Sequence, residues 1–90
     1  MNTLPSDSLP LDQHSLSQIE RWLTNLGAVK SDSEQSLWRF KNINWSAKIQ
    51  LNKHKISITW EKDGMGNMIE LPYTLSRFDI QSAILDGPLN

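Results

Sequence analysis

The stretch Trp45–Trp60, WSAKIQLNKHKISITW, decides the fold of this chain. Apolar and polar residues alternate in its first half, Trp45–Leu51, and alternate again in its second half, Ile56–Trp60. Because successive side chains of a strand point to opposite faces, each half predicts a strand with one apolar and one polar side. The polar pair Lys53-His54 separates the halves, so the two strands are predicted to fold back as an antiparallel hairpin.

Folding back at this pair sets the register of the hairpin. Neither lysine nor histidine favours the positive φ of a two-residue turn, so a four-residue loop over 52–55 is an equally good interpretation. Both loops give the same register, and a large ring opposite a small methyl group is a favourable cross-strand pair. The predicted pairs are Leu51 with Ile56, Ile49 with Ile58, and Ala47 with Trp60.

Length and composition bound the class of protein. Ninety residues suffice for one domain with a single modest core. The chain has no cysteine, which excludes disulfides, thiolate metal sites and a cysteine nucleophile. The first residues show no signal-peptide pattern, and no apolar run approaches the roughly 20 residues of a membrane span. We therefore expect a cytoplasmic protein that is not inserted in a membrane.

The segment before the hairpin predicts an arm followed by a helix. Residues 1–13 show no periodicity, so we expect a loose arm that Leu9 and Leu11 could dock. Ser15 with Gln18 forms a capping-box pattern, and Gly27 is a good C-terminal stop. Between these signals, apolar residues recur at helical spacing and predict one buried face: Leu16, Ile19, Trp22, Leu23 and Leu26.

The segments on either side of the hairpin complete the predicted fold. Two further strands are expected, one over 37–41 and one near 69–74, after a flexible turn at 63–67. Pro72 cannot donate to a ladder and places the last strand at an edge. A second helix follows Ser76 and ends at Gly87-Pro88, with a buried face supplied mostly by Phe78, Ile80, Ala83 and Ile84.

The predicted fold class is therefore α+β. It is a four-stranded antiparallel β-meander with an N-terminal and a C-terminal helix packed on one face. We expect residues 14–88 to form the single domain and residues 1–13 to form the loose arm.

Two stretches carry a resemblance to a known family. They are His14–Gly27, HSLSQIERWLTNLG, and Tyr73–Pro88, YTLSRFDIQSAILDGP. With the tryptophan-bearing strands between them, the chain resembles, over about residues 11–88, a family of small cyanobacterial proteins classed as a domain of unknown function. The resemblance implies a photosynthetic prokaryote as the source and an intracellular setting. It implies no activity, ligand or catalytic residue.

Charge is unevenly distributed along the chain. Residues 36–62 carry a net charge of +5, and the segments 1–35 and 63–90 each carry −3. The outward face of the predicted sheet is therefore basic, and it is the candidate partner-binding surface. An ordinary solvated sheet face is the competing interpretation. The candidate residues are Arg39, Lys41, Lys48 and Lys55, together with Trp38, which is expected to be partly exposed on an edge strand.

No residue pattern predicts catalysis. His14 and His54 are the only histidines, and neither has metal-ligand or acid–base partners at a usable spacing. We therefore expect no enzyme activity, no cofactor and no metal, and no pocket that gathers either histidine with a carboxylate. The favoured function is a protein-binding accessory or assembly factor that recognises an acidic protein surface. A weak RNA-binding module is the alternative, although RNA binding would call for exposed aromatic side chains on the basic face.

Overall fold

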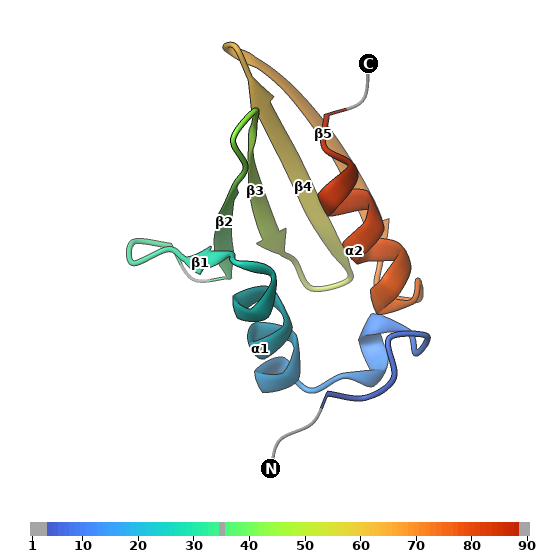
Figure 1. Cartoon of the computed structure of the whole chain (residues 1–90). Helices are drawn as coiled ribbons and strands as arrows, with labels where there is room; N and C mark the ends of the chain where they lie inside the picture. Colours follow the sequence, from blue (N-terminus) through green and yellow to red (C-terminus); the bar gives the residue numbers. More distant parts are fainter. Residues whose placement is uncertain (1–3, 35, 89–90) are drawn as a thin grey trace.

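The computed structural model describes residues 4–34 and 36–88, and it is an α+β fold in which a helix lies near each end of the chain (Figure 1). A short 3₁₀ helix, η1, precedes the first α-helix. The elements in chain order are η1 (Leu11–Gln13), α1 (Leu16–Leu26), β1 (Val29–Lys30), β2 (Leu37–Lys41), β3 (Ser46–Leu51), β4 (Lys55–Lys62), β5 (Met65–Pro72) and α2 (Arg77–Asp86).

The strands form one antiparallel sheet in the order β1-β2-β3-β4-β5. The register predicted for the central hairpin is confirmed, because Leu51 pairs with Ile56, Ile49 with Ile58, and Ala47 with Trp60. Its loop is closed by a bond of 3.0 Å from the Asn52 backbone N–H to the Lys55 carbonyl oxygen. Neither residue at the tip, Lys53 or His54, adopts a positive φ.

The sheet has five strands rather than the four predicted. The additional strand, β1, is only two residues long, too short to show any alternation in the sequence. It pairs with β2 through Val29 opposite Arg39 and Lys30 opposite Trp38. As a result β2 is an inner strand of the sheet and β1 takes the edge position.

The last hairpin is longer than the sequence indicated. Its turn consists only of Asp63 and Gly64, whose φ angles are 53° and 80°. Such a turn matches the right-handed twist of the two strands it connects. The flexible turn expected over 63–67 is therefore wrong, because β5 already begins at Met65. The edge position predicted for this strand from Pro72 is confirmed.

Both helices begin at the residues predicted to cap them. The Ser15 side chain accepts from the Gln18 backbone N–H, and the Gln18 side chain accepts from the Ser15 N–H, so both bonds of the capping box form. Gly27 ends α1 with a φ of 104°, a left-handed conformation that glycine adopts without a Cβ penalty. Ser76 caps α2 by accepting from the Asp79 N–H.

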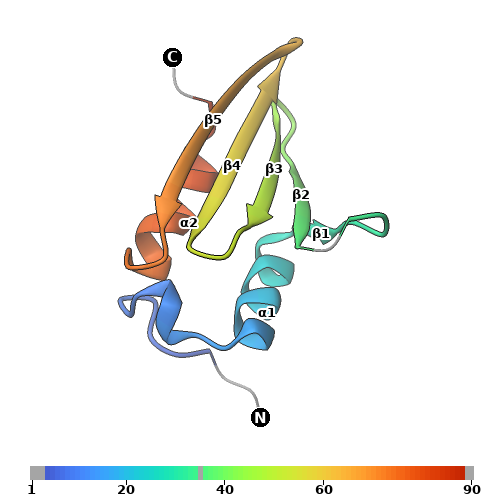
Figure 2. The same ribbon diagram turned by 180° about the vertical axis from the view of Figure 1, so that it is seen from behind.

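A single core joins both helices to the inner face of the sheet, defined by Trp38, Phe40, Ala47, Ile49, Ile58 and Trp60. Helix α2 lies in front of β4 in Figure 1 and behind it in Figure 2, whereas α1 lies toward the lower end of the sheet. The helices add the following buried residues to the inner face: Trp22, Leu23, Ile80 and Ile84.

Two residues expected on buried helix faces are instead exposed. Phe78 is 54% exposed, because a helix turns about 100° per residue and Phe78 therefore points away from the buried Ile80. Leu16 is 64% exposed: it shares the apolar stripe of Leu23 but lies almost two turns earlier, in the first turn of α1. The periodicity thus predicted both helices correctly, but it predicted more buried apolar residues on them than the structure has.

Residues 9–13 are docked against the start of α2 through Leu9 and Leu11, the two residues expected to dock the arm. Leu11 is fully buried, and its N–H donates to the Leu75 carbonyl at 2.9 Å. In return the Leu9 carbonyl accepts from the first N–H of α2, that of Arg77, at 3.0 Å. The arm thereby satisfies helix-terminal donors that would otherwise lack a partner. Residues 1–3 lie outside the described part of the chain.

We predict that Ile58→Ala lowers the free energy of unfolding by about 2–5 kcal/mol, through lost transfer energy and the cavity left behind. Ile58 is fully buried at the centre of the sheet, opposite Ile49 and Ile69. Urea unfolding followed by tryptophan fluorescence measures the change. Ile43→Ala is the matched control, because Ile43 is 96% exposed and should leave the midpoint unaltered. Equal midpoints for the two variants would contradict the observed register.

Candidate functional site

The outer face of the sheet holds three of the predicted basic residues close together. In the register of β2, β3 and β4, Arg39 lies opposite Lys48, and Lys48 lies opposite Thr59. One step along the ladder, Lys41 lies opposite Ser46 and Ser46 opposite Glu61. These residues alternate with the buried ones along each strand, so they point away from the core. We call this surface the outer face.

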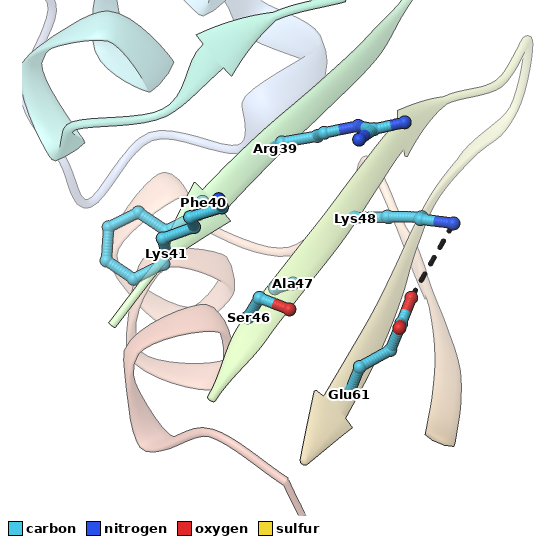
Figure 3. Close-up of a pocket in the computed structure, with 7 residues that line it drawn as sticks. All are labelled: Arg39, Phe40, Lys41, Ser46, Ala47, Lys48 and Glu61. Carbon is cyan, nitrogen blue, oxygen red and sulfur yellow. Dashed lines mark ion pairs between the residues drawn. The ribbon is translucent and has the colours of Figure 1, made fainter. Parts of the chain in front are cut away.

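A hollow of about 230 Å³ lies on this surface (Figure 3). The side chains of Arg39, Lys48 and Glu61 point to the same side of the sheet, whereas the Phe40 ring lies on the other side. The hollow is partly open to solvent, so it suits a charged group on a larger partner better than a fully enclosed small molecule. Its lining residues are Arg39, Phe40, Lys41, Ser46, Ala47, Lys48 and Glu61.

One cation of the hollow already has a carboxylate partner. Lys48 Nζ lies 3.5 Å from Glu61 Oε1, and both side chains are about half exposed (Figure 3). The two residues are diagonal neighbours across the ladder, close enough for long side chains to meet. Exposed pairs of this kind contribute little to stability. The alternation of residues in the sequence is enough to predict that Glu61 lies on this face. Its negative charge makes the face less basic than expected.

Arg39 and Lys41 differ from Lys48, since neither forms an ion pair with any residue in 4–34 or 36–88. Both are exposed on the outer face of β2. They are therefore the cations of the hollow that remain available to an external anion.

The fourth predicted basic residue, Lys55, does not line the hollow. Its Nζ lies 2.9 Å from Glu70 Oε2 on the neighbouring strand β5. Glu70 also accepts a hydrogen bond of 3.4 Å from the buried Ser57 hydroxyl, which in turn accepts from Asn52 Nδ2 at 2.8 Å. The structure thus separates the predicted basic face into the hollow and a paired cluster around Lys55.

Trp38, the aromatic residue predicted to contact a partner, lies in the core instead of on the outer face. It is only 4% exposed, so the expected partial exposure is wrong. The cause is β1, which pairs outside β2 and removes the edge on which that expectation depended. The indole Nε1 of Trp38 is buried and has no hydrogen-bond partner among the described residues.

The two histidines have different environments, one buried and one exposed. His14 is buried, with Nδ1 3.1 Å from the Pro10 carbonyl oxygen and Nε2 3.3 Å from Arg77 Nη1. Since the carbonyl can only accept and the guanidinium can only donate, we assign the neutral tautomer protonated at Nδ1. His54 is exposed in the β3–β4 turn. Within residues 4–34 and 36–88, no three histidine, aspartate or glutamate residues form a group that could hold a metal ion.

A tyrosine closes the end of the sheet that carries the β3–β4 turn, beside the Lys55 cluster. The Tyr73 hydroxyl, just beyond β5, donates to the Asn52 carbonyl oxygen in the β3–β4 turn. Burial raises the pKa of Tyr73 above its ordinary value. The folded protein therefore holds the phenolic proton more tightly than the unfolded chain does.

This raised pKa predicts a loss of stability in alkali. As pH rises above the ordinary value of about 10, the unfolded chain loses the Tyr73 proton first, so the free energy of unfolding falls. Tyr73→Phe should flatten that fall, while costing about 0.5–1 kcal/mol at neutral pH through the lost hydrogen bond. Urea midpoints measured between about pH 8 and pH 11 test both effects. Parallel pH profiles for the two proteins would contradict the prediction.

Comparison with known proteins identifies the family. The model of the family described as "Protein of unknown function (DUF3143)" matches residues 26–87, and the chain belongs to this family. The resemblance to a family of unknown function is thus confirmed, although the match begins at the end of α1 and leaves out most of the stretch His14–Gly27. Searches of curated proteins and of solved structures found no match. None of the helices in the described part of the chain is long and apolar enough to cross a membrane.

Proposed function

We propose that this DUF3143 protein is a non-enzymatic binding module that recognises an acidic protein surface through the hollow on its outer face. The observation that carries the proposal is the pair of exposed cations, Arg39 and Lys41, that have no carboxylate partner among the described residues. They stand next to a lysine, Lys48, whose own partner is half exposed and easily displaced.

The geometry favours carboxylates as the recognised groups. The Arg39 guanidinium can bind a carboxylate through two parallel N–H donors, and Lys41 and Lys48 add point charges in the same hollow. Glu61 already occupies part of the hollow with a carboxylate, which supports this choice of ligand. Charged surfaces of this kind raise the association rate and set specificity more than they raise affinity.

The aromatic residues favour protein over RNA as the partner. Single-stranded RNA is bound by stacking its bases on exposed aromatic side chains. Here the aromatic side chains of the sheet turn inward and are buried, namely Trp38, Phe40 and Trp60. The exposed Phe78 belongs to α2, which packs on the inner side of the sheet. A partner that needs only charge complementarity therefore fits the outer face better than one that needs stacking.

The proposed setting is the cytoplasm of a cyanobacterium, where the module would act as an accessory or assembly factor. The resemblance of His14–Gly27 and Tyr73–Pro88 to the cyanobacterial family supports the source. The lack of cysteine suits a reducing compartment.

We predict that replacing Arg39 and Lys41 by glutamine weakens binding of an acidic peptide at least tenfold. The probe is a fluorescently labelled glutamate-rich peptide, titrated at about physiological ionic strength, where exposed charges remain only partly screened. Glu61→Gln should have the opposite effect and strengthen binding, because it removes the carboxylate that competes for Lys48. Neither change should alter the unfolding midpoint by much, since all three side chains are exposed.

The control matches the change in net charge. Lys53→Gln with Lys62→Gln removes two exposed cations that do not line the hollow, and it should leave peptide binding unchanged. A single-stranded RNA of the same net charge as the peptide is titrated in parallel. Tighter binding of RNA that depends on Arg39 and Lys41 would replace the proposal by the RNA-binding alternative. An equal loss of peptide affinity in the two double variants would mean that the outer face is an ordinary solvated surface without a specific binding role.

A further inference from the structure

One edge of the sheet is β5, an eight-residue strand whose second side faces no other strand of the described residues (Figure 2). The opposite edge, β1, has only two residues. Long exposed edges present unpaired N–H and C=O groups that can template pairing with another chain. The β5 edge is therefore the place where this sheet can be extended.

The turn before β5 and the proline at its end show which backbone N–H and C=O groups of the strand point away from β4. In a two-residue turn the flanking residues exchange hydrogen bonds, so Met65 points its N–H and C=O toward Lys62 of β4. Backbone direction alternates along the strand, so Gly66, Met68 and Glu70 point theirs away from β4. Pro72 follows the same alternation, and its missing N–H lies on the outward side, where a proline is tolerated.

These outward groups are free in the described part of the chain. No hydrogen bond from residues 4–34 or 36–88 reaches the outward backbone groups of Gly66, Met68 or Glu70. The Pro72 carbonyl is different, because it accepts from the Leu75 N–H at 3.2 Å. The free pattern therefore consists of three residues, spaced two apart and centred on Met68.

We propose that β5 pairs with β5 of a second copy of this chain, antiparallel and centred on Met68. A two-fold axis through Met68 places Met68 opposite Met68 of the partner subunit and Gly66 opposite Glu70 of the partner subunit. Each free N–H of these three residues then meets a free C=O of the other copy. Shifting the register by two residues would oppose Gly66 to the partner subunit's Pro72, which has no N–H and an occupied carbonyl.

The side chains agree with this register. Met68 is 61% exposed, and in the dimer it packs against Met68 of the partner subunit, which removes both from water. Glu70 lies opposite Gly66 of the partner subunit, so the two carboxylates do not face each other and the long side chain has room. Edge strands commonly carry a lysine or a central proline that blocks such pairing, and β5 has neither between Met65 and Leu71.

Sedimentation velocity of the full chain over a range of concentrations tests the dimer. The expected result is a reversible monomer–dimer equilibrium that Met68→Pro shifts at least tenfold toward monomer. This proline removes one outward N–H and no bond of the β4–β5 ladder, as Pro72 already does further along the strand. Met68→Lys is the second variant, in case the proline impairs folding, and it acts by introducing a charge at the centre of the dyad.

Hydrogen exchange provides the direct readout. In the dimer the Gly66, Met68 and Glu70 amides should be protected in a concentration-dependent manner, and both variants should abolish that protection at the remaining amides. Met65→Lys is the control, because Met65 is 77% exposed but directs its backbone toward β4, and it should leave the dimer intact. A monomer at all concentrations, or a dimer that survives both Met68 variants, would overturn the proposal.

Discussion

The pairing of β3 with β4 is the interaction on which the rest of the structure depends. It sets Ala47 opposite Trp60, so the large indole covers a small side chain and is only 1% exposed. The indole Nε1 of Trp60 then donates to the Ile84 carbonyl at 3.3 Å, which ties the end of α2 to the sheet. A second indole continues the connection, because Trp22 of α1 donates to Gln81 Oε1 of α2 at 2.9 Å.

The same register also determines the outer face. Because strand side chains alternate with a period of two, burying Ala47, Ile49 and Trp60 necessarily exposes Lys48 and Glu61. A shift of one residue would bury those charges without partners, a cost far larger than the gain from any single apolar contact. The composition of the hollow is therefore a consequence of the core, and its chemistry cannot be changed by sliding a strand.

The sequence predicted those parts of the structure that depend on local pattern. Alternation identified the central hairpin and its register, and the capping residues Ser15 and Ser76 identified both helix starts. The strand β1 has only two residues and therefore shows no alternation in the sequence. Its pairing with β2, and the burial of Trp38 that goes with it, could not be predicted. The ion pairs of Lys48 and Lys55 depend on diagonal neighbours across strands, and these become known only when the whole ladder is assembled.

The hollow and the β5 edge belong to one sheet, and their geometry links them. Residues directly opposite each other in a ladder point to the same face, so a two-fold axis through Met68 keeps the outer faces of both copies on one side. Two hollows, each with Arg39 and Lys41 exposed, would then face the same direction on a continuous surface. A partner that carries two acidic segments could engage both, and the second contact would form at a high effective concentration. Exposed cations bind weakly one at a time, so pairing at the edge is a physical route by which a small basic hollow gains useful affinity.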